Sequence, residues 1–319
     1  MRSDRITEWL QSLGYGRWER AALAGDASAR RYERLADGAG QSVILMDAPP
    51  DKVSSTSDFL RLADFLSAHG LAAPAILHAE PEAGLVLLED LGTTHFADWL
   101  TNRPADEAVL YTEATDALLA VQHLGLPAGL TTLDPETAAE MVTVAFDWLP
   151  NTADEEMQRT IGEGIRSAVA TLSDRRQVLS LRDFHAENLI WRPDREGTDR
   201  VGLLDFQDAF GAPPAYDLAS LLRDARRDVA DDTANAMIDR FATATGNRSE
   251  AVARDVAILS VQRNLRILGV FARLVKRDGK HRYQGLMPRI WGHLRKDLAH
   301  PDLADLRPLM QNAFEELSE

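Results

Sequence analysis

Two short apolar runs, each followed at once by polar residues, constrain the fold of this chain more than any other feature. The first run covers residues 177–181 and stops just before Asp183; the second covers residues 201–204 and stops at Asp205. Short apolar runs bounded by polar residues predict buried strands rather than helices. A carboxylate at the end of a buried strand costs free energy unless it is paired or binds a cation. We therefore expect the polar residues after these two strands to form a functional site.

The segment before residue 90 predicts a small antiparallel sheet. Apolar spacing predicts a short helix over residues 4–13. Alternating or continuous apolar stretches, separated by turn residues, predict strands at residues 30–35, 42–47, 75–79 and 85–88. Between the second and third of these strands, Ser57 is expected to cap a helix that runs to about residue 69. The order is therefore strand, strand, helix, strand, strand.

From residue 93 onward the pattern is mainly helical, apart from the interruption at residues 178–211. Residues 255–277 carry one continuous apolar stripe, which is typical of a helix packed in a core. We predict an α+β, two-lobed fold: a small β-rich lobe over residues 1–90 and a larger, mostly helical lobe over residues 91–319. A cleft between two lobes is a favoured place for a ligand.

The composition excludes several classes of function. Asp and Glu number 50 against 35 Lys and Arg, and the resulting formal charge of −15 disfavours a nucleic-acid surface. Cysteine is absent, which excludes disulfides and cysteine-based sites. No apolar run approaches the roughly 20 residues of a membrane span, and the charged N-terminus lacks a secretory pattern, so a cytoplasmic location is expected. The alternating charges of residues 223–227 indicate a solvated helix face.

Three oxygen-bearing side chains in the two polar loops suit phosphoryl transfer. Asp183 and Asn188 are close enough in sequence to share one compact loop, and Asp205 ends the next buried strand. Mg²⁺ prefers a few carboxylate or amide oxygens together with nucleotide phosphates. A separate carboxylate can orient and deprotonate an attacking hydroxyl. The same acids with His185 and Asp208 would also suit a two-metal hydrolase, which needs no nucleotide.

The pattern Asp-x-His-x-x-Asn over residues 183–188 and Leu-Asp-Phe over residues 204–206 resembles the catalytic and metal motifs of the aminoglycoside phosphotransferase superfamily. This resemblance implies a protein-kinase-like fold and the transfer of a phosphoryl group from ATP. It further implies that Asp183 is the catalytic base and that Asn188 and Asp205 hold Mg²⁺.

The same resemblance implies that the lobe of residues 1–90 carries ATP. The turn at residues 25–28, which includes Ser28, would cover the phosphates. A hinge at Glu89 and Leu91 would lie beside the adenine and act through its backbone.

Two departures from the superfamily pattern are visible in the sequence. Leu181 stands where the superfamily usually has a histidine that supports the catalytic loop. Kinases also place a lysine on the third strand, and the matching strand at residues 42–47 has none. We expect Arg30 or Arg31, on the preceding strand, to supply the positive charge instead.

Scattered blocks between residues 23 and 285, such as residues 87–92 and 202–209, are similar to the bacterial amino-sugar kinases of this superfamily. This similarity implies a small-molecule partner, with the phosphoryl group transferred to the anomeric hydroxyl of N-acetylmuramate or N-acetylglucosamine. An aminoglycoside kinase, a choline or homoserine kinase, and a nucleotide-binding pseudokinase are the alternatives.

Several further polar residues have a structural and a functional interpretation. Asp217 is expected to support the catalytic loop from a helix start, and His185 is expected to be structural. Arg263 and Arg266 would either bind an acidic group of a sugar or pair with acids at the surface, and surface pairing is favoured. The sequence leaves open the residues that contact the acceptor, the choice between ATP and GTP, and the oligomeric state.

Overall fold

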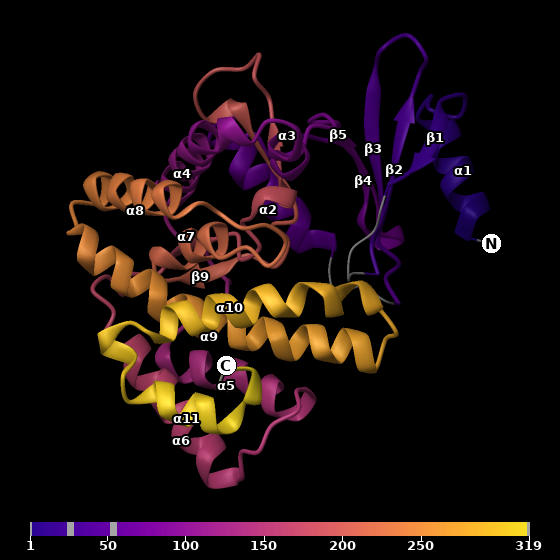
Figure 1. Cartoon of the computed structure of the whole chain (residues 1–319). Helices are drawn as coiled ribbons and strands as arrows, with labels where there is room; N and C mark the ends of the chain where they lie inside the picture. Colours follow the sequence, from indigo (N-terminus) through magenta and orange to yellow (C-terminus); the bar gives the residue numbers. More distant parts are fainter. Residues whose placement is uncertain (1, 24–28, 52–55, 318–319) are drawn as a thin grey trace. The chain divides into compact units, whose positions relative to one another are not determined.

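The structure is a computed structural model that describes residues 2–23, 29–51 and 56–317. Figure 1 shows the elements of the two compact units into which the chain divides. Unit 1 comprises Met1–Thr94 and Ile190–Gln207, and unit 2 comprises His95–Leu189 and Asp208–Glu319. The predicted fold class is confirmed, because an antiparallel sheet near the N-terminus is followed along the chain by a mostly helical remainder. The lobe limits at residues 90 and 91 stay a prediction.

Unit 1 is built on a five-stranded antiparallel sheet. In spatial order its strands are β1 (Glu19–Ala22), β2 (Arg31–Ala36), β3 (Ser42–Asp47), β5 (Leu85–Glu89) and β4 (Ile76–Glu80). Helix α2 (Thr56–Ala68) lies between β3 and β4 in the chain, as predicted, but Ser57 is its second residue rather than its cap. The sequence does not predict β1, because all four of its residues are exposed and carry no alternating apolar pattern.

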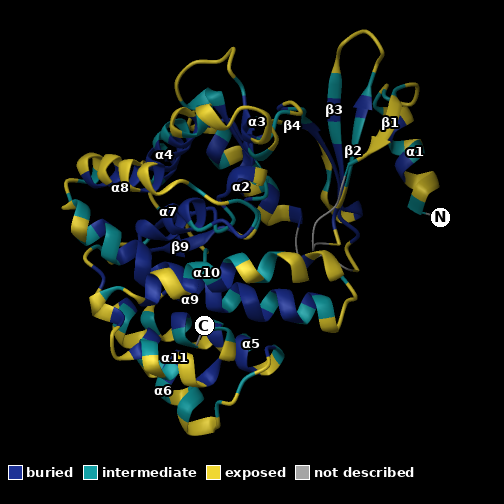
Figure 2. Cartoon of the chain, viewed as in Figure 1, coloured by how far each residue is buried: buried dark blue, intermediate teal, exposed yellow. Residues whose placement is uncertain are grey.

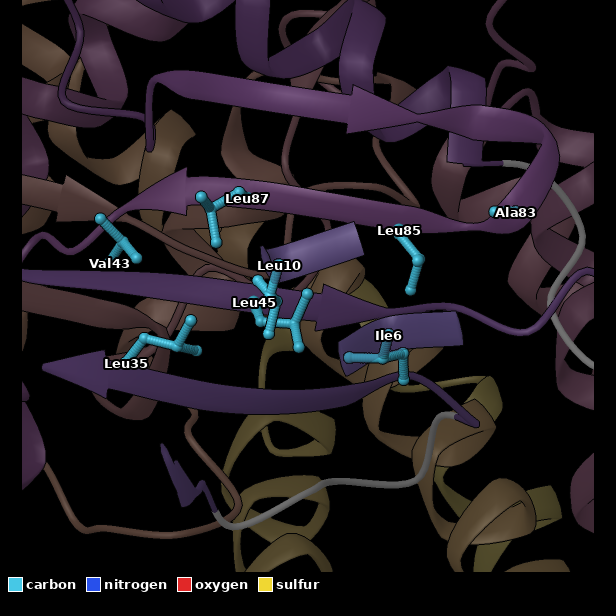
Figure 3. Packing of buried hydrophobic residues seen from close by; sticks show 8 residues of the cluster. All are labelled: Ile6, Leu10, Leu35, Val43, Leu45, Ala83, Leu85 and Leu87. Atoms are coloured by element: carbon cyan, nitrogen blue, oxygen red, sulfur yellow. The ribbon is translucent and has the colours of Figure 1, made fainter. Parts of the chain in front are cut away.

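Helix α1 (Arg2–Ser12) packs on one face of this sheet. Ile6 and Leu10, one turn apart on the helix, are both buried in the contact. Successive side chains of a strand point to opposite faces, so Leu45 of β3 and Leu87 of β5, which pair in register, lie in the same cluster (Figure 3). Complete burial of one leucine contributes roughly 1.5–3 kcal/mol, so this cluster anchors α1 to the sheet. The cluster also contains Leu35, Val43, Ala83 and Leu85.

Unit 2 is built around α9 (Ser249–Lys276), a helix of 28 residues that is buried along most of its length (Figure 2). Helices α5 (Pro135–Trp148) and α10 (Met287–Leu298) pack against it. The other α-helices are α3 (Phe96–Asn102), α4 (Glu107–His123), α6 (Glu155–Ala170), α7 (Ala215–Leu222), α8 (Asp231–Thr245) and α11 (Leu306–Ala313). None of the described helices is both long and apolar enough to cross a bilayer.

Short strands occupy the middle of the chain, where the sequence predicts a break in the helices. These are β6 (Val178–Ser180), β7 (Leu189–Trp191), β8 (Val201–Leu203) and β9 (Phe210–Ala212). β6 pairs with β9 and β7 pairs with β8. The Leu203 N–H donates to the Ala72 carbonyl at 2.8 Å, which connects the β7–β8 hairpin to the N-terminal segment of unit 1. The strands predicted before Asp183 and Asp205 are thus confirmed, whereas the sequence does not predict β9, whose three residues are Phe-Gly-Ala with a glycine at the centre.

Candidate active site

A buried carboxylate holds the loop that follows β6. Asp217 lies in the first turn of α7 and is completely buried. It accepts hydrogen bonds from the Ser180 hydroxyl at 2.7 Å, from the Leu181 N–H at 2.7 Å and from the Arg182 N–H at 3.1 Å. Burial raises the pKa of Asp217 to about 6, although these three hydrogen bonds oppose the shift. The expected role of Asp217 as a support of the loop is confirmed.

Asp183 directly follows this held stretch, and 43% of its side chain is exposed. Arg263 of α9, whose side chain is only 5% exposed, places its Nη2 3.6 Å from Asp183 Oδ1. The surface pairing favoured for Arg263 is therefore wrong. Leu181, which replaces the superfamily histidine, is buried in the core and held through its backbone. The loop thus presents an accessible carboxylate on a backbone that Asp217 keeps in place.

Asn188 lies in the same loop as Asp183, and the two residues are in contact. Its Nδ2 donates to the Asp183 carbonyl oxygen at 2.9 Å and lies 3.4 Å from His185 Nε2. Because both contacts use the amide nitrogen, Oδ1 is the atom of this side chain left to bind a cation. His185 is buried, and burial together with neighbouring arginine charges holds its pKa well below the usual value. It is therefore neutral at pH 7, which agrees with the structural role expected for it.

Asp205 follows β8 in unit 1. The Gln207 Nε2 donates to Asp205 Oδ1 at 2.6 Å, and the adjacent Phe206 stacks on Phe59 of α2 with ring centroids 5.2 Å apart. Asp205 has a φ of 57°, and Arg182 in the Asp183 loop has a φ of 70°. In the described part of the chain these are the only non-glycine residues with a positive φ. Backbone strain of this kind clusters at functional sites, which favours each loop, taken by itself, as a functional segment.

The residues expected to bind the nucleotide are in unit 1, and Ser28 is outside the described residues. Arg30 is buried just before β2, whereas Arg31 is the exposed first residue of β2. Glu89 is the last residue of β5, and Leu91, two residues further on, is buried. Their contacts with a nucleotide stay a prediction.

An ion pair that the sequence does not predict stabilises the segment after β5. Arg34 donates from Nε to Asp90 Oδ2 at 2.6 Å and from Nη2 to Asp90 Oδ1 at 3.0 Å. Its Nη2 also donates to the Gly92 carbonyl at 3.1 Å. Burial of the carboxylate acts to raise the pKa of Asp90, but the hydrogen bonds from Arg34 and from neighbouring groups outweigh it and lower this pKa. No local sequence pattern links Arg34 to a residue 56 positions away.

Strand β3 contains no lysine, as expected from the sequence. Its last residue, Asp47, is buried and accepts a hydrogen bond from Arg2 Nε of α1 at 2.7 Å. Arg31 of β2 lies directly opposite Asp47 in the register of the two strands. The end of β3 therefore carries a neutralised acid, with an exposed arginine across from it.

The interpretation of residues 223–227 as a solvated helix face is wrong. The segment follows α7 without helical structure, and Asp224 is buried. Arg223 pairs with the buried Asp297 at 2.9 Å. Arg227 likewise pairs with Glu107 at 2.5 Å, so these arginines meet acids from other elements instead of forming a solvated helix face.

Arg226, in this segment, is a neighbour of the Asp183 loop that the sequence does not predict. Its Nη1 donates to His185 Nε2 at 3.2 Å, and its Nε lies 2.6 Å from Glu187 Oε2. Arg226 therefore holds the imidazole and one side of the loop together. The signal available in the sequence was the dense run of arginines and aspartates directly after an apolar helix.

Mg²⁺ takes carboxylate and amide oxygens, and Asp205 and Asn188 carry one of each. The two residues belong to different units, and their joint role as metal ligands stays a prediction. Among the residues that the structure describes, no group of three or more histidine, cysteine, aspartate and glutamate side chains is arranged to hold a metal ion.

Solved structures share this fold at low sequence identity. A choline/ethanolamine kinase family protein from Mesorhizobium loti superposes with a TM-score of 0.66 at 16% identity, over 98% of this chain and 99% of its own. An ADP-bound aminoglycoside phosphotransferase superposes with a TM-score of 0.64 at 15% identity, over 96% of this chain and 99% of its own. The fold is therefore the protein-kinase-like fold of the aminoglycoside and choline kinases.

Sequence comparison identifies the family. The pattern of the phosphotransferase enzyme family matches residues 19–254. The N-acetylmuramate/N-acetylglucosamine kinase of Caulobacter vibrioides is 37% identical, over 94% of this chain and 93% of its own length. This chain therefore belongs to the phosphotransferase enzyme family, and it is an enzyme that phosphorylates a small molecule. The resemblance inferred from the motifs is confirmed, and the hydrolase and pseudokinase interpretations are set aside.

Proposed function

We propose that this enzyme transfers the γ-phosphoryl group of ATP to the anomeric hydroxyl of N-acetylmuramate or N-acetylglucosamine. The Caulobacter relative that carries this acceptor in its name matches nearly the whole chain. The ADP-bound structure of the same fold supports ATP as the phosphoryl donor. ATP as donor is also consistent with the cytoplasmic location expected from the sequence, which stays a prediction.

The observation that carries the proposal is the accessible Asp183 carboxylate on a loop held by Asp217. Asp183 would orient the acceptor hydroxyl and take its proton as the oxygen attacks the γ-phosphorus. Arg263, 3.6 Å from the carboxylate, would pair with it and restrict its orientation. No covalent enzyme intermediate is needed in such a direct transfer.

Asn188, the loop with Asp205 and the sheet would bind the magnesium–nucleotide complex. Asn188 and Asp205 would hold a Mg²⁺ ion, which would neutralise charge on the transferring phosphoryl group when bound. The turn with Ser28 would cover the phosphates, with Arg30 or Arg31 in place of the missing lysine. Glu89 and Leu91 would meet the adenine through their backbone groups. In this proposal residues 1–90 form the nucleotide-binding lobe and residues 91–319 form the catalytic and substrate-binding lobe.

Another acceptor is the main alternative. The structures that share the fold include a choline/ethanolamine kinase family protein and an aminoglycoside phosphotransferase. A kinase for aminoglycosides, choline or homoserine would use the same base and metal residues and would differ only in the acceptor.

A screen of phosphoryl acceptors tests the proposal. Purified enzyme with ATP and Mg²⁺ is offered N-acetylmuramate, N-acetylglucosamine, an aminoglycoside, choline and homoserine, and products are identified by mass and by the position of the phosphate. We expect a sugar 1-phosphate. Asp183→Asn is expected to lower kcat by about 10²–10⁴-fold, whereas the exposed Asp194→Asn leaves it unchanged. Turnover of another alcohol alone would contradict the proposed acceptor and leave the phosphotransferase assignment standing.

A further inference from the structure

Two arginines on α9 face the loop that carries Asp183. Arg263 and Arg266 are three residues apart, so their side chains lie on the same side of the helix. The contact of Arg263 with Asp183 at 3.6 Å shows that this side of the helix faces the Asp183 loop. Arg266 is half-buried, and the charges of Asp183, Arg182 and Arg263 all act on it. Both guanidinium groups therefore belong to the surroundings of the proposed base.

The two arginines differ in how their charge is compensated. Arg263 has the carboxylate of Asp183 as its partner. Arg266 has no hydrogen bond and no ion pair with any residue in the described part of the chain. Burial lowers the pKa of Arg266, but a guanidinium remains protonated at neutral pH. A half-buried charge without a counter-ion is costly unless a ligand supplies one.

The other charged groups near the loop do not neutralise Arg266. Arg182 contributes a third guanidinium, which lies 5.6 Å from the centre of the Phe210 ring. The buried Asp217 is enclosed by its three hydrogen-bond donors from the loop, and the buried Asp224 accepts from the Arg226 N–H at 2.9 Å. Neither acid pairs with Arg266. A carboxylate of a bound ligand would therefore supply the counter-charge that these acids do not give to Arg266.

We propose that Arg266, with Arg263 beside it, binds the carboxylate of an acidic amino sugar. N-acetylmuramate carries such a carboxylate on its lactyl group, and N-acetylglucosamine is the same sugar without it. A guanidinium binds a carboxylate through two parallel hydrogen bonds, which would fix the sugar relative to Asp183. This inference rests on the proposed function and goes beyond it, because it names the residue that discriminates between the two sugars.

Steady-state kinetics with both sugars test the inference. For Arg266→Gln we expect the KM for N-acetylmuramate to rise by about tenfold or more, the size of a lost hydrogen bond between charged groups. The kinetic constants for N-acetylglucosamine and the KM for ATP are expected to stay unchanged. Arg266→Lys should recover part of the loss, because an ammonium keeps the charge without the two-pronged geometry. Arg277→Gln, an exposed arginine directly after α9 that pairs with Asp278, is the matched control.

Equal losses for both sugars, or a raised KM for ATP, would show that Arg266 acts on the phosphoryl group or on the loop, and would overturn the inference. Calorimetric binding of the two sugars to the wild type without nucleotide is a second, independent measurement that needs no variant. It should show tighter binding of N-acetylmuramate, with the preference lost in Arg266→Gln. If the wild type phosphorylates neither sugar, the proposed function fails by itself. The binding comparison still tests the inference. If the wild type does not bind N-acetylmuramate more tightly than N-acetylglucosamine, the inference is overturned.

Discussion

At the scale of single residues, the backbone of the loop that carries Asp183 depends on Asp217. Its pKa of about 6 lies above the ordinary value of 3.8, so folding favours the protonated form. The contribution of this group to stability is therefore fully present below about pH 4 and is lost as the pH rises through about 6. At neutral pH the enzyme keeps an ionised carboxylate in its interior, and that carboxylate accepts the hydrogen bonds that shape the loop.

Replacing Asp217 with Asn is expected to remove this pH dependence. As the pH rises from 4.5 to 7.5, the free energy of unfolding of the variant should increase relative to wild type by on the order of 2 kcal/mol. Its kcat should fall, because an amide offers one acceptor oxygen in place of two. Urea unfolding at several pH values measures the first effect, and Asp194→Asn is the exposed control. A difference that stays constant with pH would contradict the prediction.

The ion pair between Arg34 and Asp90 gives a second prediction at this scale. Arg34→Gln leaves the carboxylate of Asp90, 5% exposed, without its counter-charge, so we expect the free energy of unfolding to fall by roughly 2–4 kcal/mol. Arg20→Gln removes the pair with Glu33, whose side chains are 30% and 28% exposed, and should cost less than about 1 kcal/mol. Urea unfolding of both variants makes the comparison, and equal losses would show that burial of Asp90 does not matter.

At the scale of elements, the arrangement of α9 decides what surrounds the loop. The same helix packs against α5 through Gly269 and presents Arg263 to Asp183. A Cβ built on Gly269 would lie 2.6 Å from the Val144 carbonyl oxygen of α5. Because that neighbour is backbone, it cannot move aside without shifting the helix. The distance between the two helices and the position of Arg263 are therefore linked.

Gly269→Ala is expected to destabilise the protein by about 1–3 kcal/mol, because the extra methyl group overpacks the helix crossing. Gly292→Ala in α10 is the matched control, since a Cβ there meets nothing within 4 Å. It should be neutral or add up to about 1 kcal/mol through its better helix propensity. Thermal unfolding of the two variants measures the difference. A loss of stability in Gly292→Ala as large as that in Gly269→Ala would refute the role of the close approach.

At the scale of the whole molecule, the proposed reaction needs residues from both compact units. Asp183 and Asn188 belong to unit 2, whereas Asp205 and the residues assigned to the nucleotide belong to unit 1. Each unit has its own core, so a ligand held by both would add to the stability of the folded protein by mass action.

We expect ATP to raise the thermal stability of the protein more in the presence of Mg²⁺ than in its absence. At a ligand concentration of about 100 times Kd the free energy of unfolding should rise by roughly 2.7 kcal/mol. Asp205→Asn is expected to lose the part that depends on Mg²⁺, and Asp194→Asn is expected to retain it. Differential scanning calorimetry with ATP, with and without Mg²⁺, measures both. An undiminished effect of Mg²⁺ in Asp205→Asn would remove this residue from the proposed metal site.

The sequence by itself determined most of the elements, though not β1 or β9, and it determined the family. Strands ending near Asp183 and Asp205, the helix–sheet order of the first 90 residues and the superfamily motifs could all be predicted, because they depend on local spacing and on residue chemistry. Only the tertiary structure revealed that Arg263 is buried against Asp183, that Arg34 holds Asp90 and that Arg226 holds His185. These pairs join residues far apart in the chain, and a charged residue has the same local pattern whether it faces solvent or an internal partner. The partner, and with it the difference between a surface charge and a binding group, exists only once the chain has folded.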